Sequence, residues 1–596
     1  MTKPPLRVAN CSGFYGDRIT AAKEMVEGGP IDVLTGDWLA ELTMLILARS
    51  RKGGVGGYAR TFVTQMEQVM TTCLEKGIKV VTNAGGLDPQ ACADAVAAVA
   101  AKLGVSPKIA YITGDDLLPR WDDLRADGYA FTNFDTGAEL GDRTPMTANA
   151  YLGGWGIAEA LRQGADIVIA GRVTDAAVVV GPAAWYHEWK RDDWDQLAGA
   201  VVAGHIIECG CQATGGNYSF FTEVPGLEHP GFPIAEIAAD GSCVITKHEG
   251  TGGLVSVGTV TAQLLYEIQG VRYINPDVIT RFDTISVSQQ GPDRVLVTGT
   301  RGEPAPPTTK VCINLDGGYR NTMSFCLTGL NIEAKAELVE RTFWGNQNGG
   351  RESFAQATTR LIRSDKDDPA SNEEGVALLS FTVKDPDERK VGRAFANAGV
   401  EMALSSYPGM FGTGAPSAAQ AYGVYWPALV PNELCPSVVH LDGRSTTVEA
   451  TAAVYPPVDI EPGTLNAQAG PTQNGNSGTN TTRAPLGRLI GARSGDKGGN
   501  ANIGVWVRND EEYSWMSSFL TPEKIQELLP ETRSLVVKRS ELPNLLSLNF
   551  VIVGLLEEGV AASTRMDAQA KGLGEYLRAK IVDLPVFAGE ISLETT

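Results

Sequence analysis

The chain has 596 residues, a length that predicts three or four domains at roughly 100 to 200 residues per domain. Its hydrophobic fraction of 43% and charged fraction of 20% are ordinary for globular proteins, which excludes a disordered, collagen-like or coiled-coil chain. The 70 acidic residues outnumber the 50 basic ones, and the formal net charge is -20. Because such a surface repels phosphates, we expect neither nucleic acid nor membrane as a partner.

The nine cysteines and the N-terminus indicate the compartment. Nine is an odd number and no CxxC pair occurs, so a disulfide framework or a structural zinc finger is not expected. The N-terminus has no apolar signal-peptide core, and no window of ~18 uninterrupted apolar residues occurs. We therefore expect a cytoplasmic protein.

The first 180 residues repeat one pattern, in which an apolar, β-rich run passes through a glycine-rich or polar junction into a helical stretch. This alternation is typical of a parallel α/β sheet. The carboxyl-end loops of such a sheet gather at one edge, where ligands bind. The predicted strands are residues 6–10, 32–35, 78–82, 108–113 and 166–170.

Two of these junctions, CSGFYGD at 11–17 and NAGGLDP at 83–89, are rich in glycine. Backbone N–H groups there can hold an anion at the positive end of the following helix. A purely structural turn is the alternative, and neither motif has the GxGxxG spacing of a dinucleotide site. The candidate substrate-binding residues are Ser12, Gly13, Asn83, Gly85 and Gly86.

Two further junctions, GDWLAE and AGRVTD, place ionisable side chains at strand ends. Asp37 and Glu41 are four residues apart and would share one helical face. Arg172 offers a planar fork for a carboxylate or phosphate, and Asp175 occupies a helix N-cap position. In the alternative interpretation, both aspartates are caps and Arg172 neutralises one of them.

A histidine and a glutamate, His205 and Glu208, are three residues apart on a predicted helix. This spacing suits two metal ligands or a base with its orienting group, and structural hydrogen bonding is a third alternative. The only comparable cluster is His248 with Glu249. A nucleophilic thiol in the nearby CxC motif is a weaker hypothesis than two buried cysteines.

Two TGG motifs offer close backbone approach and N–H donors for an oxyanion. The second immediately precedes a predicted helix and is the better candidate. Their glycines are Gly215, Gly216, Gly252 and Gly253.

The pattern of apolar and polar residues divides the chain into four segments. Residues 1–280 form the α/β domain, and alternating runs at 281–455 predict an α+β domain. Residues 456–485 lack apolar periodicity and predict a flexible linker. Residues 486–596 predict a ferredoxin-like α+β sandwich that contains no cysteine, which excludes an iron–sulfur cluster.

The loop RSGDKGGN of this last domain carries Arg493 and Lys497 in a glycine-rich setting. We expect an anion clamp that docks over the crevice of the first domain. A turn braced by Asp496 and Lys497 is the alternative.

Eight ordered motifs carry a family resemblance over nearly the whole chain. They are CSGFYGDR, GDWLAELTM, NAGGLDP, AGRVTD, HIIECGCQATGGN, KHEGTGG, LLYEI and YGVYWPALVP. The series resembles the acyclic terpene utilisation family AtuA, and SGDKGGNANIGV at 494–505 resembles the ferredoxin-fold domain that often follows it. The resemblance implies branched, acyclic terpenoid or related acid catabolism, beside enzymes that handle acyl-CoA thioesters.

These observations lead to one preferred function and two alternatives. We expect a lyase or hydratase in which His205 is the base or acid, Glu208 orients it, and Arg172 holds a carboxylate of an acyl or carboxylic-acid substrate. Gly252 and Gly253 would stabilise an enolate-like oxygen, with Asp37 and Asp175 as further catalytic candidates.

One alternative is a metal-dependent hydrolase with His205, Glu208 and His248 as ligands of a divalent metal and Asp37 or Asp175 completing the site. The other is a non-catalytic acyl-binding scaffold. Beyond that metal, the only cofactor considered is CoA as part of the substrate, and the expected assembly is a homo-oligomer.

Overall fold

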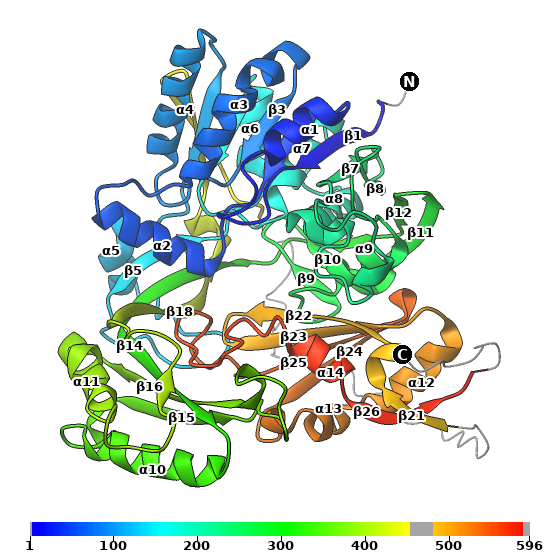
Figure 1. The fold of residues 1–596 in the computed structure, drawn as a ribbon. Coiled ribbons are helices and arrows are strands. Elements are labelled where there is room, and N and C mark those ends of the chain that lie inside the picture. The colour runs from blue at the N-terminus through cyan, green and yellow to red at the C-terminus, as the bar shows by residue number, and fades with distance from the viewer. Residues whose placement is uncertain (1–2, 453–480, 588–596) are drawn as a thin grey trace. The chain divides into compact units, whose positions relative to one another are not determined.

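The structure is a computed structural model that describes residues 3–452 and 481–587 (Figure 1). The chain divides into two compact units. The larger consists of Met1–Asn314, Tyr425–Val560 and Asp567–Thr596, and the smaller of Leu315–Val424 and Ala561–Met566.

The larger unit is built on an eleven-stranded sheet in the order β11-β12-β8-β7-β1-β2-β3-β6-β4-β19-β20. Five neighbouring strands at its centre pair in parallel, which confirms the parallel sheet predicted from the sequence. They are β1 (Leu6–Asn10), β2 (Val33–Gly36), β3 (Lys79–Thr82), β6 (Ile167–Ala170) and β4 (Ile109–Thr113).

Antiparallel strands extend this sheet on both sides, so the sheet as a whole is mixed. The added strands are β7 (Pro233–Ile237), β8 (Cys243–Lys247), β12 (Arg294–Thr298) and β11 (Ser286–Gly291) at one edge, and β19 (Ser437–Leu441) and β20 (Arg444–Val448) at the other. The prediction of a separate domain at 281–455 is therefore wrong in its boundaries. Both ends of that segment complete the first sheet, because edge strands satisfy backbone groups that the parallel core leaves unpaired.

Helices cover the sheet and carry its core. The apolar residues of α1 (Ala21–Gly28), α3 (Arg60–Lys76) and α4 (Pro89–Leu103) form one hydrophobic cluster with the central strands. Three more helices, α6 (Trp155–Arg162), α7 (Ala177–His187) and α8 (Trp194–Ile207), pack against one another in sequence, and α7 and α8 are buried along most of their length. Burial on all sides explains their continuous apolar sequences.

Shorter elements of the larger unit position the candidate site. Helix α2 (Glu41–Lys52) follows β2, strand β5 (Pro145–Ala150) leads to Tyr151, and α9 (Val257–Leu264) precedes a turn at 265–268. A small sheet of β9 (Arg272–Ile274), β10 (Ile279–Arg281) and β13 (Arg301–Glu303) packs near α8.

The C-terminal domain lies within the larger unit and has its own hydrophobic core. Its four antiparallel strands run in the order β22 (Gly491–Lys497), β23 (Asn500–Trp506), β25 (Ser547–Ile552) and β24 (Val537–Leu542). Its helices are α12 (Asp510–Phe519), α13 (Pro522–Leu528) and α14 (Leu573–Arg578). These elements match the α+β sandwich expected from the sequence.

The predicted linker at 456–485 lies outside the described residues up to residue 480. Its last five residues form β21 (Thr481–Pro485), which pairs antiparallel with β26 (Ile581–Pro585). The domain therefore includes residues 481–485, which the sequence assigned to the linker. Apolar periodicity did not reveal this strand because only Ala484 is buried in it.

The smaller unit is an α+β layer with an aromatic core centred on Phe325, Phe343 and Phe381. Its strands run in the order β15 (Gln356–Ile362), β16 (Val376–Asp385), β14 (Thr308–Thr328) and β17 (Phe411–Gly412), and β18 (Gln420–Pro431) also pairs with β14. Helices α10 (Ile332–Gly345) and α11 (Phe395–Val400) pack on this sheet.

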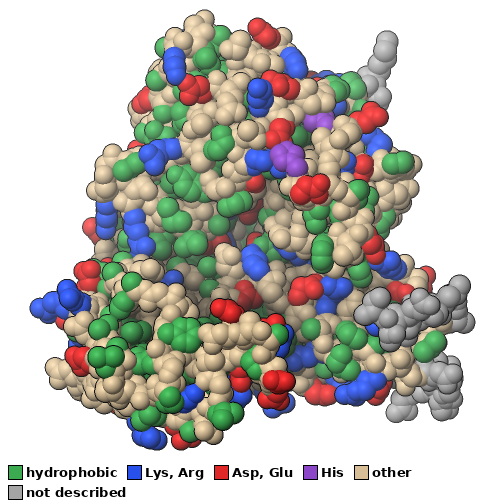
Figure 2. Space-filling view, viewed as in Figure 1, with side chains coloured by type: hydrophobic (Ala, Val, Ile, Leu, Met, Phe, Trp, Pro, Cys, Tyr) green, Lys and Arg blue, Asp and Glu red, His purple; other side chains and the backbone are tan. Residues whose placement is uncertain are grey.

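Two surface properties bear on partners. Acidic and basic side chains are interspersed over the face seen in Figure 2, without a continuous basic stripe on that face. Among the described residues, no helix is both long and apolar enough to cross a membrane.

Candidate functional site

Loops after the parallel strands are locked to one another by buried polar side chains. Asp37, which follows β2, accepts hydrogen bonds at Oδ1 from the Leu39 N–H (3.0 Å) and from Asn83 Nδ2 (2.5 Å). Asn83 Oδ1 in turn accepts from the Trp38 N–H at 2.9 Å. Burial, with the nearby charge of Asp175, raises the pKa of Asp37 well above its usual value. Asn83 therefore joins its own loop to the loop that follows β2.

Arg172 is a buried structural cation. Its Nη1 donates to the Leu39 carbonyl at 2.9 Å, its Nη2 pairs with Asp175, and its guanidinium lies 4.1 Å from the centroid of the Tyr151 ring. Burial opposes the charge, but Asp175, Tyr151 and Asp37 together raise the pKa of Arg172 well above its usual range. Both terminal nitrogens of Arg172 are engaged, whereas its Nε has no partner among the described residues, so the prediction that Arg172 holds a substrate carboxylate stays a prediction. The alternative, in which it neutralises an aspartate, agrees with the structure.

A second ion pair joins helix α2 to strand β14. Glu41 Oε1 accepts from Lys310 Nζ at 3.1 Å and from the Tyr151 hydroxyl at 2.9 Å. The Lys310 amine lies 4.6 Å from the Tyr151 ring centroid and 5.4 Å from that of Tyr425. Although burial opposes ionisation, Lys310 and Arg172 lower the pKa of Glu41. Sequence reasoning missed Tyr151, Lys310 and Tyr425, because contacts between such distant segments leave no local pattern.

His205 and Glu208 form the expected pair. Nδ1 of His205 and Oε1 of Glu208 are 3.2 Å apart, because α8 ends at Ile207 and still gives them helical spacing. Burial, with Lys497, lowers the pKa of His205 to about 4. Burial, with the charges of Asp175 and Glu267, raises the pKa of Glu208 well above its usual value. The surroundings therefore favour the neutral form of the imidazole and oppose ionisation of the carboxyl group.

The two members of this pair differ in their surroundings. The His205 ring is fully buried between Tyr273 and Phe282, with ring centroids 5.0 and 5.6 Å away. Within the described residues, neither His205 Nε2 nor Glu208 Oε2 has a hydrogen-bond partner. Three charged side chains, Asp175, Glu267 and Lys497, act on both members of the pair, and together with Glu208 they form the charged cluster.

Lys497 is a residue of the C-terminal domain that lies in this cluster. It ends β22, and its amine lies 5.9 Å from the Tyr273 ring centroid. Across the part of the chain that the structure describes, no hydrogen bond or ion pair is formed by this amine. Burial opposes its charge, but Glu267, Glu41 and Asp175 raise the pKa of Lys497. The side chain is therefore an ammonium group with no ion-pair partner, where the sequence predicted an anion clamp.

A second lysine of the C-terminal domain lies on the solvent side of the cluster. Lys571 Nζ bonds to the Tyr266 hydroxyl, to Glu267 Oε1 at 3.3 Å and to Asp496 Oδ1 at 3.2 Å. Burial and the charge of Glu267 raise the pKa of Asp496 to about 6. Arg493 lies 4.5 Å from the Tyr266 ring centroid and donates to the Asn217 carbonyl, so it braces the domain contact.

His248 does not join this cluster. Its Nε2 donates to the Met25 carbonyl at 2.9 Å, and its ring packs against Gly28 and Gly29. The metal-ligand set of His205, Glu208 and His248 is therefore not assembled. Within 3–452 and 481–587, no group of three or more His, Cys, Asp or Glu side chains is placed to hold a metal ion.

The glycine-rich loops use their N–H groups for their own folding, contrary to the prediction of anion and oxyanion sites. The bonds are Gly13 N–H to Asp17 Oδ2, Gly85 N–H to Ala170 O, Gly86 N–H to Asn83 O, Gly215 N–H to Gln212 O, Gly216 N–H to Cys211 O and Gly253 N–H to Pro225 O. A Cβ on Gly252 would lie 2.2 Å from the Gly226 carbonyl oxygen, and Ser12 Oγ donates to the Phe14 carbonyl. These loops are the structural turns of the alternative interpretation.

Two family models match the chain. Residues 6–441 match the model of the acyclic terpene utilisation family protein AtuA, and residues 484–583 match the AtuA ferredoxin-like domain. The chain belongs to the AtuA family. The family resemblance and the ferredoxin-like nature of the C-terminal domain, both predicted from the sequence, are thereby confirmed. No curated protein and no solved structure matches this AtuA-family chain.

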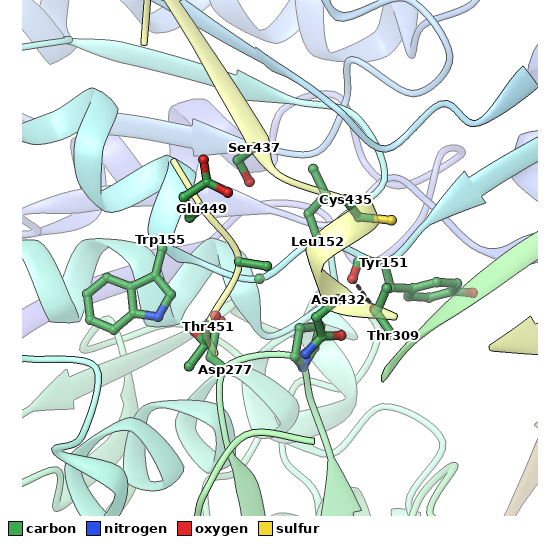
Figure 3. Close-up of a pocket in the computed structure, with 13 residues that line it drawn as sticks. Tyr151, Leu152, Trp155, Asp277, Thr309, Asn432, Cys435, Ser437, Glu449 and Thr451 are labelled. Carbon is green, nitrogen blue, oxygen red and sulfur yellow. Dashed lines mark hydrogen bonds between the residues drawn. The ribbon is translucent and has the colours of Figure 1, made fainter. Parts of the chain in front are cut away.

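A separate, small pocket lies beside the cluster of this AtuA-family protein (Figure 3). It meets the cluster at Tyr151 and is lined further by Leu152, Trp155 and Asn432. Asp277 lies in its wall and accepts from the Gly154 N–H at 2.6 Å. None of the residues predicted from the sequence lines this pocket.

Proposed function

We propose that this AtuA-family chain is an enzyme of branched, acyclic terpenoid or related acyl metabolism, and that it is a lyase or hydratase that works by general acid–base catalysis. The observation that carries the proposal is one juxtaposition. Glu208, whose Oε2 has no partner among the described residues and whose pKa is raised by burial, lies within electrostatic reach of Lys497, which forms no ion pair there. A proton donor beside an unused cation suits a substrate oxygen that gains negative charge.

The roles of His205 and Glu208 are the reverse of those expected from the sequence. Burial favours the neutral imidazole, so we take Nδ1 of His205 as the acceptor of a hydrogen bond from the Glu208 carboxyl group. His205 is completely buried and enclosed by two aromatic rings, whereas Glu208 is 6% exposed. We therefore assign proton transfer to Glu208 and its positioning to His205.

The charges of the cluster bear on the substrate. Glu41, Asp175 and Glu267 are paired with Lys310, Arg172 and Lys571 respectively, whereas Lys497 has no ion pair among the described residues. A single cation of this kind suits one carboxylate or thioester carbonyl better than a multiply charged phosphate group. In a CoA thioester, the acyl group would enter the cluster and the phosphates would stay outside it.

A direct test uses the purified chain with branched hydroxyacyl and unsaturated acyl substrates, each as the free acid and as the CoA thioester. Mass spectrometry in D₂O would follow gain or loss of water and deuterium incorporation beside the carbonyl carbon. We expect conversion by the wild type, loss of about 10²-fold or more in E208Q, and unchanged rates in E228Q, which alters an exposed glutamate. Equal rates in E208Q and the wild type would remove the assignment of Glu208.

The complete burial of His205 favours one second candidate, a non-catalytic acyl-binding subunit. In that case the same screen would show binding, measured by calorimetry, without conversion of any compound. Conversion by the isolated chain would exclude it.

A further inference from the structure

Glu267 has an unusual backbone. Its φ of 58° lies in the left-handed region, which side chains other than glycine and asparagine rarely adopt. It follows α9 in the turn at 265–268, where Tyr266 N–H bonds back to the Gln263 carbonyl. Such strain persists only where the surroundings impose it, and it concentrates at functional sites.

Two buried asparagines of the C-terminal sheet impose this conformation. Asn502 Oδ1 accepts from the Glu267 N–H at 2.8 Å, and Asn502 Nδ2 donates to Asn549. Asn549 Nδ2 donates to the carbonyl of Ile268 at 3.3 Å. Both asparagines are fully buried, so strands β23 and β25 fix the backbone on each side of the Glu267 side chain.

The Glu267 carboxylate is directed into the charged cluster. Oε1 accepts from Lys571 Nζ at 3.3 Å, and the side chain is 30% exposed. Its charge raises the pKa values of Lys497 and of Glu208. Glu267 is therefore solvated and paired with a cation, whereas Glu208 is buried beside a neutral imidazole.

We propose that Glu267 is the general base of the site, the counterpart of the acid Glu208, and that Asn502 is the positioning residue that aims it. This inference rests on the proposed function and deepens it. Glu267 is 30% exposed and paired with the Lys571 cation, whereas Glu208 is buried beside an imidazole and has one oxygen without a partner among the described residues, and such a contrast between two carboxyl groups suits a base and an acid. The C-terminal domain thus supplies Lys497, which stabilises the negatively charged oxygen, and Asn502, which positions the base Glu267.

For a 3-hydroxyacyl substrate, Glu267 takes the proton from the carbon next to the carbonyl. The electron pair of the broken carbon–hydrogen bond forms an enolate whose oxygen lies by Lys497. Collapse of the enolate forms the carbon–carbon double bond and breaks the carbon–oxygen bond, while Glu208 gives its proton to the departing hydroxyl to form water. Glu267 is then protonated and Glu208 ionised, and proton exchange with solvent restores both. Hydration is the reverse.

The first experiment separates base from acid by isotope exchange. In E267Q, deuterium incorporation at the carbon beside the carbonyl should fall by about 10²-fold or more, whereas E208Q should keep that exchange and lose water elimination. E267D should recover part of the rate. Equal exchange in E267Q and the wild type would overturn the proposal. An absence of exchange in the wild type with every compound would contradict the proposed function itself.

A second experiment needs no turnover. The infrared band of protonated Glu208, assigned by its loss in E208Q, is titrated in the wild type and in E267Q. Removing the Glu267 charge should shift the Glu208 titration to lower pH. N502A should also shift it to lower pH, because Glu267 would no longer be held toward Glu208. The other titratable groups near Glu267 are the same in every variant compared. They are Lys571, Lys497, Asp496, Tyr266, Tyr273, His205, Cys209 and Asp175. An unchanged titration in E267Q would overturn the proposed pairing.

Replacing Glu267 by glycine distinguishes a functional from a structural role. Glycine adopts a positive φ without strain, so E267G should melt at or above the wild-type temperature and still lose exchange. A lower melting temperature with retained exchange would show that Glu267 serves the fold.

Discussion

Lys310 and Glu41, separated by 269 residues in the chain, form an ion pair of 3.1 Å against the ring of Tyr151. Because Lys310 and Arg172 lower the pKa of Glu41, the folded state binds its proton more weakly than the unfolded state does. The resulting stability is fully present above the unfolded pKa of about 4.3 and is lost as pH falls below it.

Breaking this pair should therefore destabilise the chain in a pH-dependent way. K310M should lower the free energy of unfolding by about 1–2 kcal/mol at pH 7, less than for a fully buried pair because both side chains are partly exposed. The loss should shrink below pH 4. Denaturant unfolding at both pH values measures it. K23M, which removes the exposed pair of Lys23 and Glu27 at 4.0 Å, is the control and should change little. A pH-independent loss in K310M would contradict this account.

His205 should make the chain sensitive to mild acid. Its pKa of about 4 in the folded state lies below the unfolded value of about 6.5, so the unfolded state binds the extra proton first. Stability should fall between pH 6.5 and 4 by up to about 3 kcal/mol from this group. H205Q should flatten that part of the profile, whereas H229Q, at an exposed histidine, should leave it unchanged. Identical profiles for H205Q and the wild type would show that His205 is not neutral and buried in solution.

Lys497 should act on substrate binding and on the rate together. K497M should lower kcat/KM by about 10²-fold or more, because Arg172, Lys310 and Lys571 are paired with carboxylates and Arg493 is bonded to the Asn217 carbonyl. K497R should recover part of this loss. K524M, which removes a lysine paired with Glu527 in the same domain, should have wild-type kinetics. A K497M enzyme with normal kcat/KM would exclude Lys497 from the site.

The contact at Gly504 should control the site from a distance. A Cβ at this position would lie 2.3 Å from the Leu265 Cβ, in the turn that carries Glu267. G504A should therefore displace that turn and reduce kcat about tenfold or more, while circular dichroism still reports a folded protein. G345A, at a position with no atom within 4 Å of the added Cβ, should behave as the wild type. Full activity in G504A would mean that the turn tolerates the shift.

The sequence predicted most of the local structure. The five central strands were identified because their apolar runs end at glycine-rich junctions, a signal that lies within a few residues. The pair His205 and Glu208 was identified for the same reason, since helical spacing alone brings it together.

What sequence reasoning missed depends on long-range pairing. Lys310, Tyr151 and Lys571 carry no motif, and their roles arise from partners 75 or more residues away. The glycine loops were misassigned because a glycine that lets a ligand approach and one that lets another backbone approach have the same sequence signal. Only the bond from Gly253 N–H to Pro225 and its counterparts distinguish the two.

The cluster draws Glu208 and Glu267 from one side of residues 453–480 and Lys497 and Lys571 from the other. Because the two halves are covalently connected, their association is intramolecular and has a high effective concentration. Two separate polypeptides would reach the same occupancy only at a comparably high protein concentration. If the chain were cut between 452 and 481 and the fragments diluted, catalysis should become second order in protein and be recovered by adding either fragment in excess. Fusion of the two domains thus makes the completed site independent of how much protein the cell contains.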